Sequence, residues 1–191
     1  MGRPSLRTER RAELLQAFVR VLGAHGRGGA TIANVAAEAG IAPGLVHHYF
    51  TDKSELYSAL VEQLVAGFRA RAARATVPDP LEAYVHAALD LGDTSDVAAA
   101  RAWVGVFAEA LGDPSLFAKV RRALDAEVAH VERCARGALS AADASAVVAF
   151  VVGALVFGAF APRKTAGFAA PRLLRLIAAL SVDRSRMAPA G

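Results

Sequence analysis

The stretch TIANVAAEAGIAPGLVHHYF, residues 31–50, contains the signals of two short helices joined by a tight turn. Thr31 stands where a helix N-cap is expected, and an apolar face repeats behind it at helical spacing. Gly40 ends this first helix, and Pro43 suits the first turn of the next one. The sequence therefore predicts one helix from the Thr31 cap to Gly40 and a second over about 43–49.

The residues at the turn fit two helices that cross at a steep angle. Such a pair needs a small residue at the crossing, and Ala36 supplies it. Gly40 permits a turn conformation that other residues rarely adopt, while Ile41 and Val46 supply apolar anchors. This is the spacing of a helix-turn-helix, whose second helix enters the major groove of DNA. We therefore expect this stretch to bind double-stranded DNA.

The remainder of the 191-residue chain also favours helices, because Ala and aliphatic residues dominate and only eight prolines are present. Val77-Pro78-Asp79-Pro80 is the clearest boundary, since two prolines end one helix and begin the next. We predict an all-α fold with an N-terminal helix-turn-helix domain (1–50), a connecting helix (51–77) and a C-terminal helical domain (78–191). About nine helices are expected: 7–25, the two described above, one capped by Thr51 or Asp52, 80–91, 96–111, 114–138, 142–161 and 170–181.

The net charge of +4 is unevenly distributed. Residues 1–74 hold ten Lys and Arg against six Asp and Glu, whereas the remaining residues hold twelve of each. Four arginines lie within the first eleven positions: Arg3, Arg7, Arg10 and Arg11. This asymmetry favours an anionic partner for the N-terminal part, although a basic terminus can also be an ordinary solvated surface.

Cysteine content and hydropathy restrict the location of the protein. Cys134 is the single cysteine, which excludes an internal disulfide and a multi-cysteine zinc site, and the N-terminus is too charged for a signal peptide. Residues 144–161 carry no charge, which meets the lower length limit for a membrane span. Their richness in Ala and Gly, without aromatic girdles, favours a buried helix instead. We expect a cytoplasmic protein with no membrane insertion.

The polar residues near the predicted turn suit contacts with DNA. Free N–H groups at the starts of both helices can hold phosphates, with the Thr31 hydroxyl and the Lys53 ammonium as further donors. We expect His47 to face the bases, His48 to lean toward the following helix, Phe50 to enter the core and the Tyr49 hydroxyl to reach a phosphate. The predicted DNA-binding residues are Thr31, Ala42, Pro43, Gly44, His47, His48, Tyr49 and Lys53.

Residues 40–56, GIAPGLVHHYFTDKSEL, resemble the DNA-binding signature of the tetracycline-repressor (TetR) family, and TIANVAAEAG before them matches it too. The resemblance covers about residues 8–60. It implies a homodimeric transcriptional repressor that binds a palindromic operator and is released by a small-molecule inducer. Two positions depart from the family pattern. Ala42 lacks the hydroxyl of the usual Ser or Thr, which puts one phosphate contact in doubt, and His47 replaces the usual Tyr, which points to a different base preference.

The HisTyrPhe variant and residues 100–116 further resemble the subgroup of the choline-responsive repressor of betaine synthesis. The resemblance implies that the C-terminal domain binds a ligand and dimerises. Candidate ligand residues are Tyr84, Trp103, Phe107 and His130, each of which can also be plain core. Trp103 and Phe107, one helical turn apart, suit a quaternary ammonium through cation–π contact, with Glu109 as a source of negative charge.

The resemblance also implies that the last two long helices pair with their symmetry mates in a four-helix bundle. The uncharged helix at 144–161 and the apolar face of the final helix fit that arrangement. The predicted dimer-interface residues are Val148, Val152, Leu155, Leu173 and Ile177.

Other functions lack the residues that they need. Neighbouring histidines on a helix point about 100° apart, which argues against a metal or catalytic role for His47 and His48. The glycine cluster at 26–29 lacks the strand and the Lys-Ser/Thr of a phosphate loop, so it predicts a helix stop. No enzymatic motif, metal site or cofactor is expected. One alternative stays open: a helical DNA-binding protein without a small-molecule switch, which responds to a protein or acts architecturally.

Overall fold

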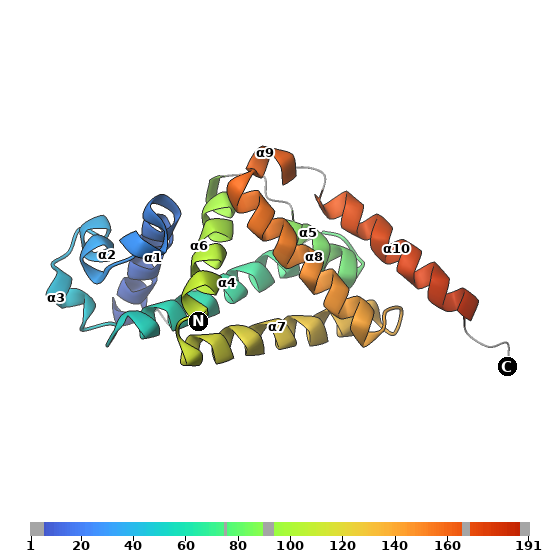
Figure 1. The fold of residues 1–191 in the computed structure, drawn as a ribbon, viewed down its shortest axis with the longest axis horizontal. Helices are drawn as coiled ribbons and strands as arrows, with labels where there is room; N and C mark the ends of the chain where they lie inside the picture. Colours follow the sequence, from blue (N-terminus) through green and yellow to red (C-terminus); the bar gives the residue numbers. More distant parts are fainter. Residues whose placement is uncertain (1–5, 75, 90–93, 166–168, 188–191) are drawn as a thin grey trace. The chain divides into compact units, whose positions relative to one another are not determined.

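The computed structural model describes residues 6–74, 76–89, 94–165 and 169–187, which are helical and contain no strand (Figure 1). The predicted all-α class is confirmed. Single-turn α9 is the one helical segment among these residues that the sequence did not predict. The segments are α1 (Leu6–Gly29), α2 (Ile32–Glu38), α3 (Pro43–Val46), α4 (Lys53–Arg74), α5 (Pro80–Leu89), α6 (Thr94–Ala110), α7 (Pro114–Ala135), α8 (Ala141–Phe160), α9 (Pro162–Thr165) and α10 (Ala169–Met187).

The chain divides into two compact units. Unit 1 comprises Met1–Val65 and Ala98–Val120, and unit 2 comprises Ala66–Val97 and Arg121–Gly191. Residues 98–120, which the proline boundary assigned to the C-terminal domain, thus pack with the N-terminal residues. Prolines indicate where a helix ends, but they do not indicate whether a later helix packs against an earlier part of the chain.

In unit 1, α1 packs on α2 and α2 packs on α3. The glycine cluster interrupts α1 as predicted, because Gly26 has φ of 62° and ψ of −167°, which is not helical backbone. Phe18 of α1 and Tyr57 of α4 are fully buried and meet edge to face, with ring centroids 4.8 Å apart. The largest fully buried side chains of this unit are Phe18, Val35, Val46, Phe50, Leu56, Tyr57, Leu60, Val106 and Leu116.

The turn between α2 and α3 has the geometry that the glycine predicted. Gly40 has φ of 68°, in the left-handed region that a residue with a Cβ enters at a cost. Its N–H donates to the carbonyl of Ala37, and the N–H of Ile41 donates to the carbonyl of Ala36 at 3.0 Å. This pair of bonds is a Schellman cap, which satisfies the last carbonyls of α2 and turns the chain toward α3.

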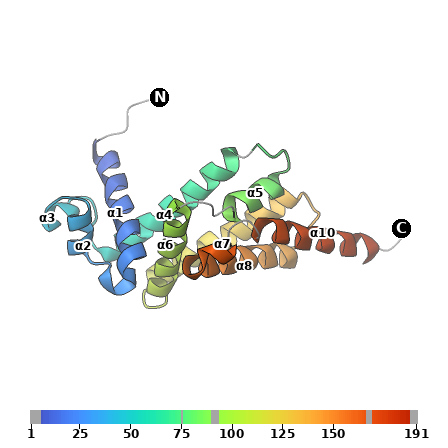
Figure 2. The same cartoon turned by 90° about the horizontal axis from the view of Figure 1, so that it is seen from above.

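In unit 2, α5, α8 and α10 pack against one another (Figures 1 and 2). A capping box starts α8, in which the Ser140 hydroxyl accepts from the Asp143 N–H and the Asp143 carboxylate accepts from the Ser140 N–H. Among the described residues, α8 is the one helix long and apolar enough to cross a membrane by length and composition, and 33% of its apolar window is buried. A helix in the core of a protein can be equally long and apolar.

Candidate DNA-binding interface

The outer surface of α3 is exposed, while its inner face anchors it to the core of unit 1. Ala42, Pro43, Gly44 and Leu45 are all exposed, whereas Val46 is fully buried, as predicted for an anchor. Ile41, the second predicted anchor, is half-buried. The predicted DNA-binding residues of this segment are therefore accessible to a large ligand.

Helix α3 ends at Val46 rather than near Tyr49. After it, His48 N–H donates to Leu45 C=O at 3.2 Å and Tyr49 N–H donates to Val46 C=O at 2.9 Å, so the chain tightens into turns. The tighter path brings Phe50 into the core, where it is fully buried as predicted. The N–H of Phe50 also donates to the Val46 carbonyl at 2.9 Å, so the turns that lead into the core satisfy the last carbonyl of α3.

The two histidines lie differently from the predicted arrangement, in which His48 leans toward the following helix. Both are exposed, so His48 does not pack in the core. His47, rather than His48, contacts the segment that leads to α4, with its Nδ1 3.4 Å from the Thr51 carbonyl oxygen. His47 thus contacts the chain before α4, whereas the side chain of His48, just after α3, is exposed.

Thr31 caps α2, as predicted. Its hydroxyl oxygen accepts from the Asn34 N–H at 3.2 Å, and the Asn34 side-chain amide donates to the Gly29 carbonyl at 2.7 Å. Thr31 remains exposed, so its hydroxyl hydrogen can still be donated outward. The cap and a phosphate contact are therefore compatible.

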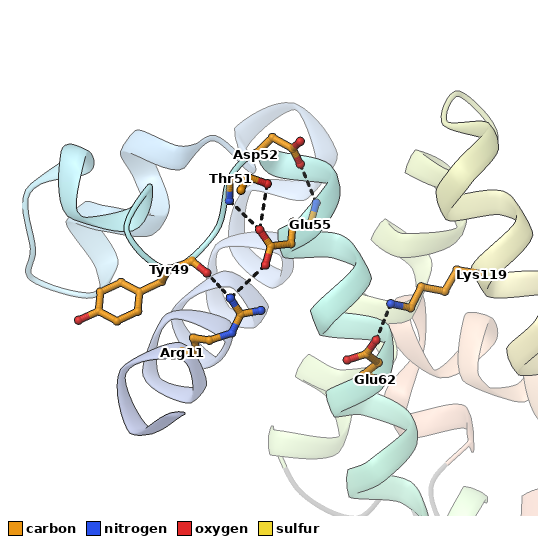
Figure 3. Close-up of polar contacts among 7 residues, drawn as sticks. All are labelled: Arg11, Tyr49, Thr51, Asp52, Glu55, Glu62 and Lys119. Atoms are coloured by element: carbon orange, nitrogen blue, oxygen red, sulfur yellow. Dashed lines mark hydrogen bonds and ion pairs between the residues drawn. The ribbon is translucent and has the colours of Figure 1, made fainter. Parts of the chain in front are cut away.

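A brace that the sequence did not reveal connects α1 to the start of α4 (Figure 3). The Arg11 guanidinium donates to the Tyr49 carbonyl and to Glu55 Oε1, the latter at 3.0 Å, and it lies 4.1 Å from the Phe50 ring centroid. Arg11 was counted in the basic N-terminal surface, but it is half-buried and engaged within unit 1. Its partners lie 38 and 44 residues away along the chain, so local sequence patterns could not predict these contacts.

Glu55 completes this brace from the other side (Figure 3). Its Oε2 accepts from the Thr51 N–H at 2.7 Å and from the Thr51 hydroxyl at 2.9 Å. The backbone hydrogen bond from Thr51 is the main reason that the pKa of Glu55 lies below its ordinary value, followed by the Thr51 hydroxyl and Arg11. Asp52, one of the two predicted caps, accepts from the Glu55 N–H at 2.8 Å and begins α4.

Lys53 already has a partner within unit 1. Its ammonium lies 3.3 Å from Glu109 Oε1, while Arg27 Nε donates to Glu109 Oε2 at 2.6 Å. Glu109 is only 17% exposed, so both of its oxygens are neutralised in a mostly buried position. A contact between Lys53 and a phosphate would therefore compete with this ion pair. The same pairing excludes Glu109 as the free negative charge expected beside Trp103 and Phe107.

Further polar contacts connect α4 to α6 and α7 within unit 1. The Ser54 hydroxyl donates to Asp113 at 2.7 Å, and Asp113 also accepts the first free N–H groups of α7. The Ser54 bond is the main reason that the pKa of Asp113 lies below its ordinary value. Lys119 of α7 pairs with Glu62 of α4 at 2.6 Å (Figure 3). The helix that follows the helix-turn-helix is thus bound to α6 and α7 by charge.

The four predicted ligand residues form two pairs in different units. Trp103 and Phe107 stack with centroids 5.5 Å apart in unit 1. Tyr84 and His130 lie in unit 2, with centroids 5.7 Å apart. Each pair is therefore a local cluster of rings in its own unit.

The predicted dimer residues need correction. Val148, Leu173 and Ile177 are 6%, 2% and 7% exposed, because the packing of α5, α8 and α10 buries them within the protomer. Val152 and Leu155 are partly buried against the same core. Among the described side chains of these helices, the large apolar ones left exposed are Phe157 and Phe160 of α8 and Leu176 of α10.

The comparisons with known proteins agree with this geometry. Residues 14–60 match the family described as bacterial regulatory proteins, tetR family. The HTH-type transcriptional regulator BetI of Paraburkholderia phytofirmans is 34% identical over 122 residues, which cover 61% of this chain and 62% of the relative. The chain thus spans less than two thirds of the length of that relative.

Solved structures show the same fold over most of the chain. A transcriptional regulator from Rhodococcus sp. Rha1 has a TM-score of 0.78 at 24% identity, covering 89% of this chain and 95% of that one. A transcriptional regulator from Saccharomonospora viridis, crystallised with choline, has a TM-score of 0.74 at 19% identity, covering 88% and 95%. Residues 14–60, which include the exposed helix-turn-helix, thus match the tetR family of bacterial regulatory proteins, and the chain shares the fold of these solved transcriptional regulators.

Proposed function

We propose that the protein is a cytoplasmic transcriptional repressor that binds a palindromic operator as a homodimer and is released by a small molecule. The observation that carries this proposal is the exposed outer face of α3, held by a buried Val46 and a Schellman-capped turn. A dimer would present two such helices about 34–36 Å apart, one turn of B-DNA. The names of the relatives, HTH-type transcriptional regulators, support the same assignment.

Contacts with DNA would divide into phosphate and base contacts. Thr31, Tyr49 and Lys53 are the proposed phosphate donors, with Lys53 exchanging Glu109 for a phosphate. Ala42, Pro43, Gly44, His47 and His48 form the surface proposed to meet the base edges.

The test is to select an operator from a random DNA pool and to measure its affinity against salt. We expect the dissociation constant to rise by about 10³ between about 50 and 200 mM salt if roughly six phosphates are contacted. His47→Ala should change the preferred base pairs at a cost of about 1 kcal/mol, whereas Lys53→Ala should weaken all sequences alike. His25→Ala, an exposed histidine outside the helix-turn-helix, is the control. An affinity that does not vary with salt would contradict the proposal.

The proposed dimer uses the apolar surface that the protomer leaves exposed on α8 and α10. Phe157 and Phe160 are 50% and 77% exposed, and Gly153 on α8 is open enough that a Cβ there would meet nothing within 4 Å. A twofold interface places the same patch on both subunits, so one charged residue is introduced twice. Phe157→Glu should give a monomer in light scattering, whereas Leu111→Glu, at an exposed apolar residue of unit 1, should not. A dimeric Phe157→Glu variant would exclude this surface.

A further inference from the structure

Unit 2 contains a carboxylate whose hydrogen bonding is incomplete. Glu127 of α7 has a side chain only 13% exposed, and its Oε1 pairs with Arg69 Nη2 at 2.9 Å. Its Oε2 is buried, and no group in the described part of the chain donates a hydrogen bond to it. A buried acceptor without a donor is costly, and native proteins seldom retain one without a reason.

Aromatic rings surround this region of unit 2. Tyr84 of α5, 2% exposed, meets Phe68 of α4 edge to face with centroids 5.1 Å apart. On its other side, Tyr84 lies 5.7 Å from the His130 ring, and His130 is one turn after Glu127 on α7. We call Phe68, Tyr84, Glu127 and His130 the Glu127 cluster. It combines apolar ring faces with one buried negative charge.

Arg69 balances the charge of Glu127 through one oxygen, and the other titratable groups of the cluster are neutral near pH 7. Burial, and then the charge of Glu127, raise the pKa of Tyr84, so its hydroxyl stays neutral. Burial also lowers the pKa of His130, although Glu127 acts in the opposite direction, so a neutral imidazole is favoured near pH 7. His130 Nε2 lies 3.5 Å from the Cys134 sulfur, another neutral group at that pH, whose pKa burial raises. Arg69 and Arg133 are the cations that lower the pKa of His130, and Arg69 occupies the other Glu127 oxygen.

We propose that Glu127 Oε2 accepts a hydrogen bond from the protonated amine of a small organic ligand, whose apolar body packs against the rings of Phe68, Tyr84 and His130. The proposal rests on the proposed function, because it identifies the ligand class that would act on this regulator. A primary ammonium supplies both the positive charge and the N–H donor that an unpaired acceptor requires. A quaternary ammonium supplies the charge but no donor.

Two other occupants fit the cluster less well. A metal ion needs several ligating groups, and among the described residues no three His, Cys, Asp or Glu side chains are grouped to hold one. The stacked pair Trp103 and Phe107 offers ring faces to a cation, but its neighbour Glu109 is already paired through both oxygens. Of these two carboxylates, Glu127 is therefore the one with an oxygen left to accept a ligand.

The experiment is calorimetric titration of the full chain, without DNA, with methylammonium, butylammonium and 2-phenylethylammonium chlorides. The neutral controls are the matched alcohols methanol, butanol and 2-phenylethanol. We expect at least one amine to bind tenfold or more tightly than its alcohol. Glu127→Gln should abolish that preference, whereas Asp125→Asn, at an exposed carboxylate of the same helix, should retain it. Tyr84→Phe, which keeps the ring, should retain it as well.

The results that would overturn the proposal are equally specific. They are an absence of binding by all three amines, an equal affinity for amine and alcohol, or full amine affinity in Glu127→Gln. Equal affinity for 2-phenylethylammonium and its N-trimethyl derivative would overturn the requirement for an N–H donor. Because the titration contains no DNA and the operator selection contains no amine, a failure of this proposal is separate from a failure of the proposed function.

Discussion

Two mostly buried glutamates, one in each unit, have opposite surroundings. Glu109 in unit 1 is 17% exposed and has a cation at each oxygen, from Arg27 and Lys53. Glu127 in unit 2 is 13% exposed and has one ion pair, with its second oxygen buried and unpaired among the described residues. The two carboxylates are thus similarly buried, but Glu109 has a partner at both oxygens and Glu127, within the described part of the chain, at only one of them. A carboxylate whose partners are all internal holds elements together, whereas one with an unused acceptor can bind another molecule.

The largest expected effect on stability is at Glu109. Glu109→Gln removes the charge that joins Arg27 of α1 to Lys53 of α4, leaving two cations beside each other without their shared anion. We expect the free energy of unfolding to fall by about 2 kcal/mol, because the substitution breaks two ion pairs at one mostly buried carboxylate. Denaturant unfolding followed by the fluorescence of Trp103, the single tryptophan and a residue of unit 1, measures this change.

The control for that measurement is Glu62→Gln. Glu62 also forms an ion pair across unit 1, with Lys119 at 2.6 Å, but its side chain is 71% exposed. An exposed pair contributes little, so we expect a change below about 0.5 kcal/mol. Equal effects of the two substitutions would mean that burial does not set the strength of these bridges.

A second, smaller effect should appear at Glu55 as a dependence on pH. The pKa of Glu55 in the folded protein is lowered, chiefly by the hydrogen bond from the Thr51 N–H. The ionised carboxylate therefore contributes to the free energy of unfolding above the ordinary carboxyl pKa, and this contribution is lost as the pH falls through the folded pKa. With the side chain 35% exposed, we expect Glu55→Gln to cost about 1 kcal/mol at pH 7 and progressively less as the pH falls below the ordinary carboxyl pKa. Unfolding of both proteins across this pH range measures the difference. A constant difference would mean that the carboxylate charge is not the source.

The smallest expected effect is at Glu127. Glu127→Gln removes a buried charge whose Arg69 partner is 50% exposed and can be solvated without it. Loss of the ion pair and relief of desolvation nearly cancel, so we expect a change in stability of less than about 0.5 kcal/mol. Thermal unfolding followed by far-ultraviolet circular dichroism measures it. A loss close to that of Glu109→Gln would make Glu127 a structural residue and remove the contrast between the two glutamates.

The helices and the turn near the DNA-binding surface were predictable because their causes are local. Thr31 caps α2 three residues away, Gly40 closes a cap that spans six residues, and Pro43 begins α3. Each signal depends on residues within about one and a half helical turns, a distance over which sequence spacing and spatial distance agree. The end of α3 was misjudged: the helix ends at Val46, and turns lead from it to the ring of Phe50, whose burial is a tertiary contact.

The candidate ligand and dimer residues were harder to predict, because aromatic and aliphatic residues look alike in the core and on an interface. Tyr84 and His130 do lie together, but Glu109 proved to be neutralised from α1 and α4. Val148, Leu173 and Ile177 are apolar and correctly spaced, yet the protomer buries them itself. Hydrophobic periodicity identifies which face of a helix is covered, but it does not identify what covers it.

Local pattern thus determined the helical class, the capped turn and the exposed residues of α3, since these follow from hydrogen bonds and packing between near neighbours. Long-range packing alone decided which charges are satisfied. Arg11 reaches residues 38 and 44 positions away, and Arg27 reaches Glu109 across 82 positions. Whether a carboxylate has one partner or two depends on which distant helices pass beside it, and that is set only when the whole chain has folded.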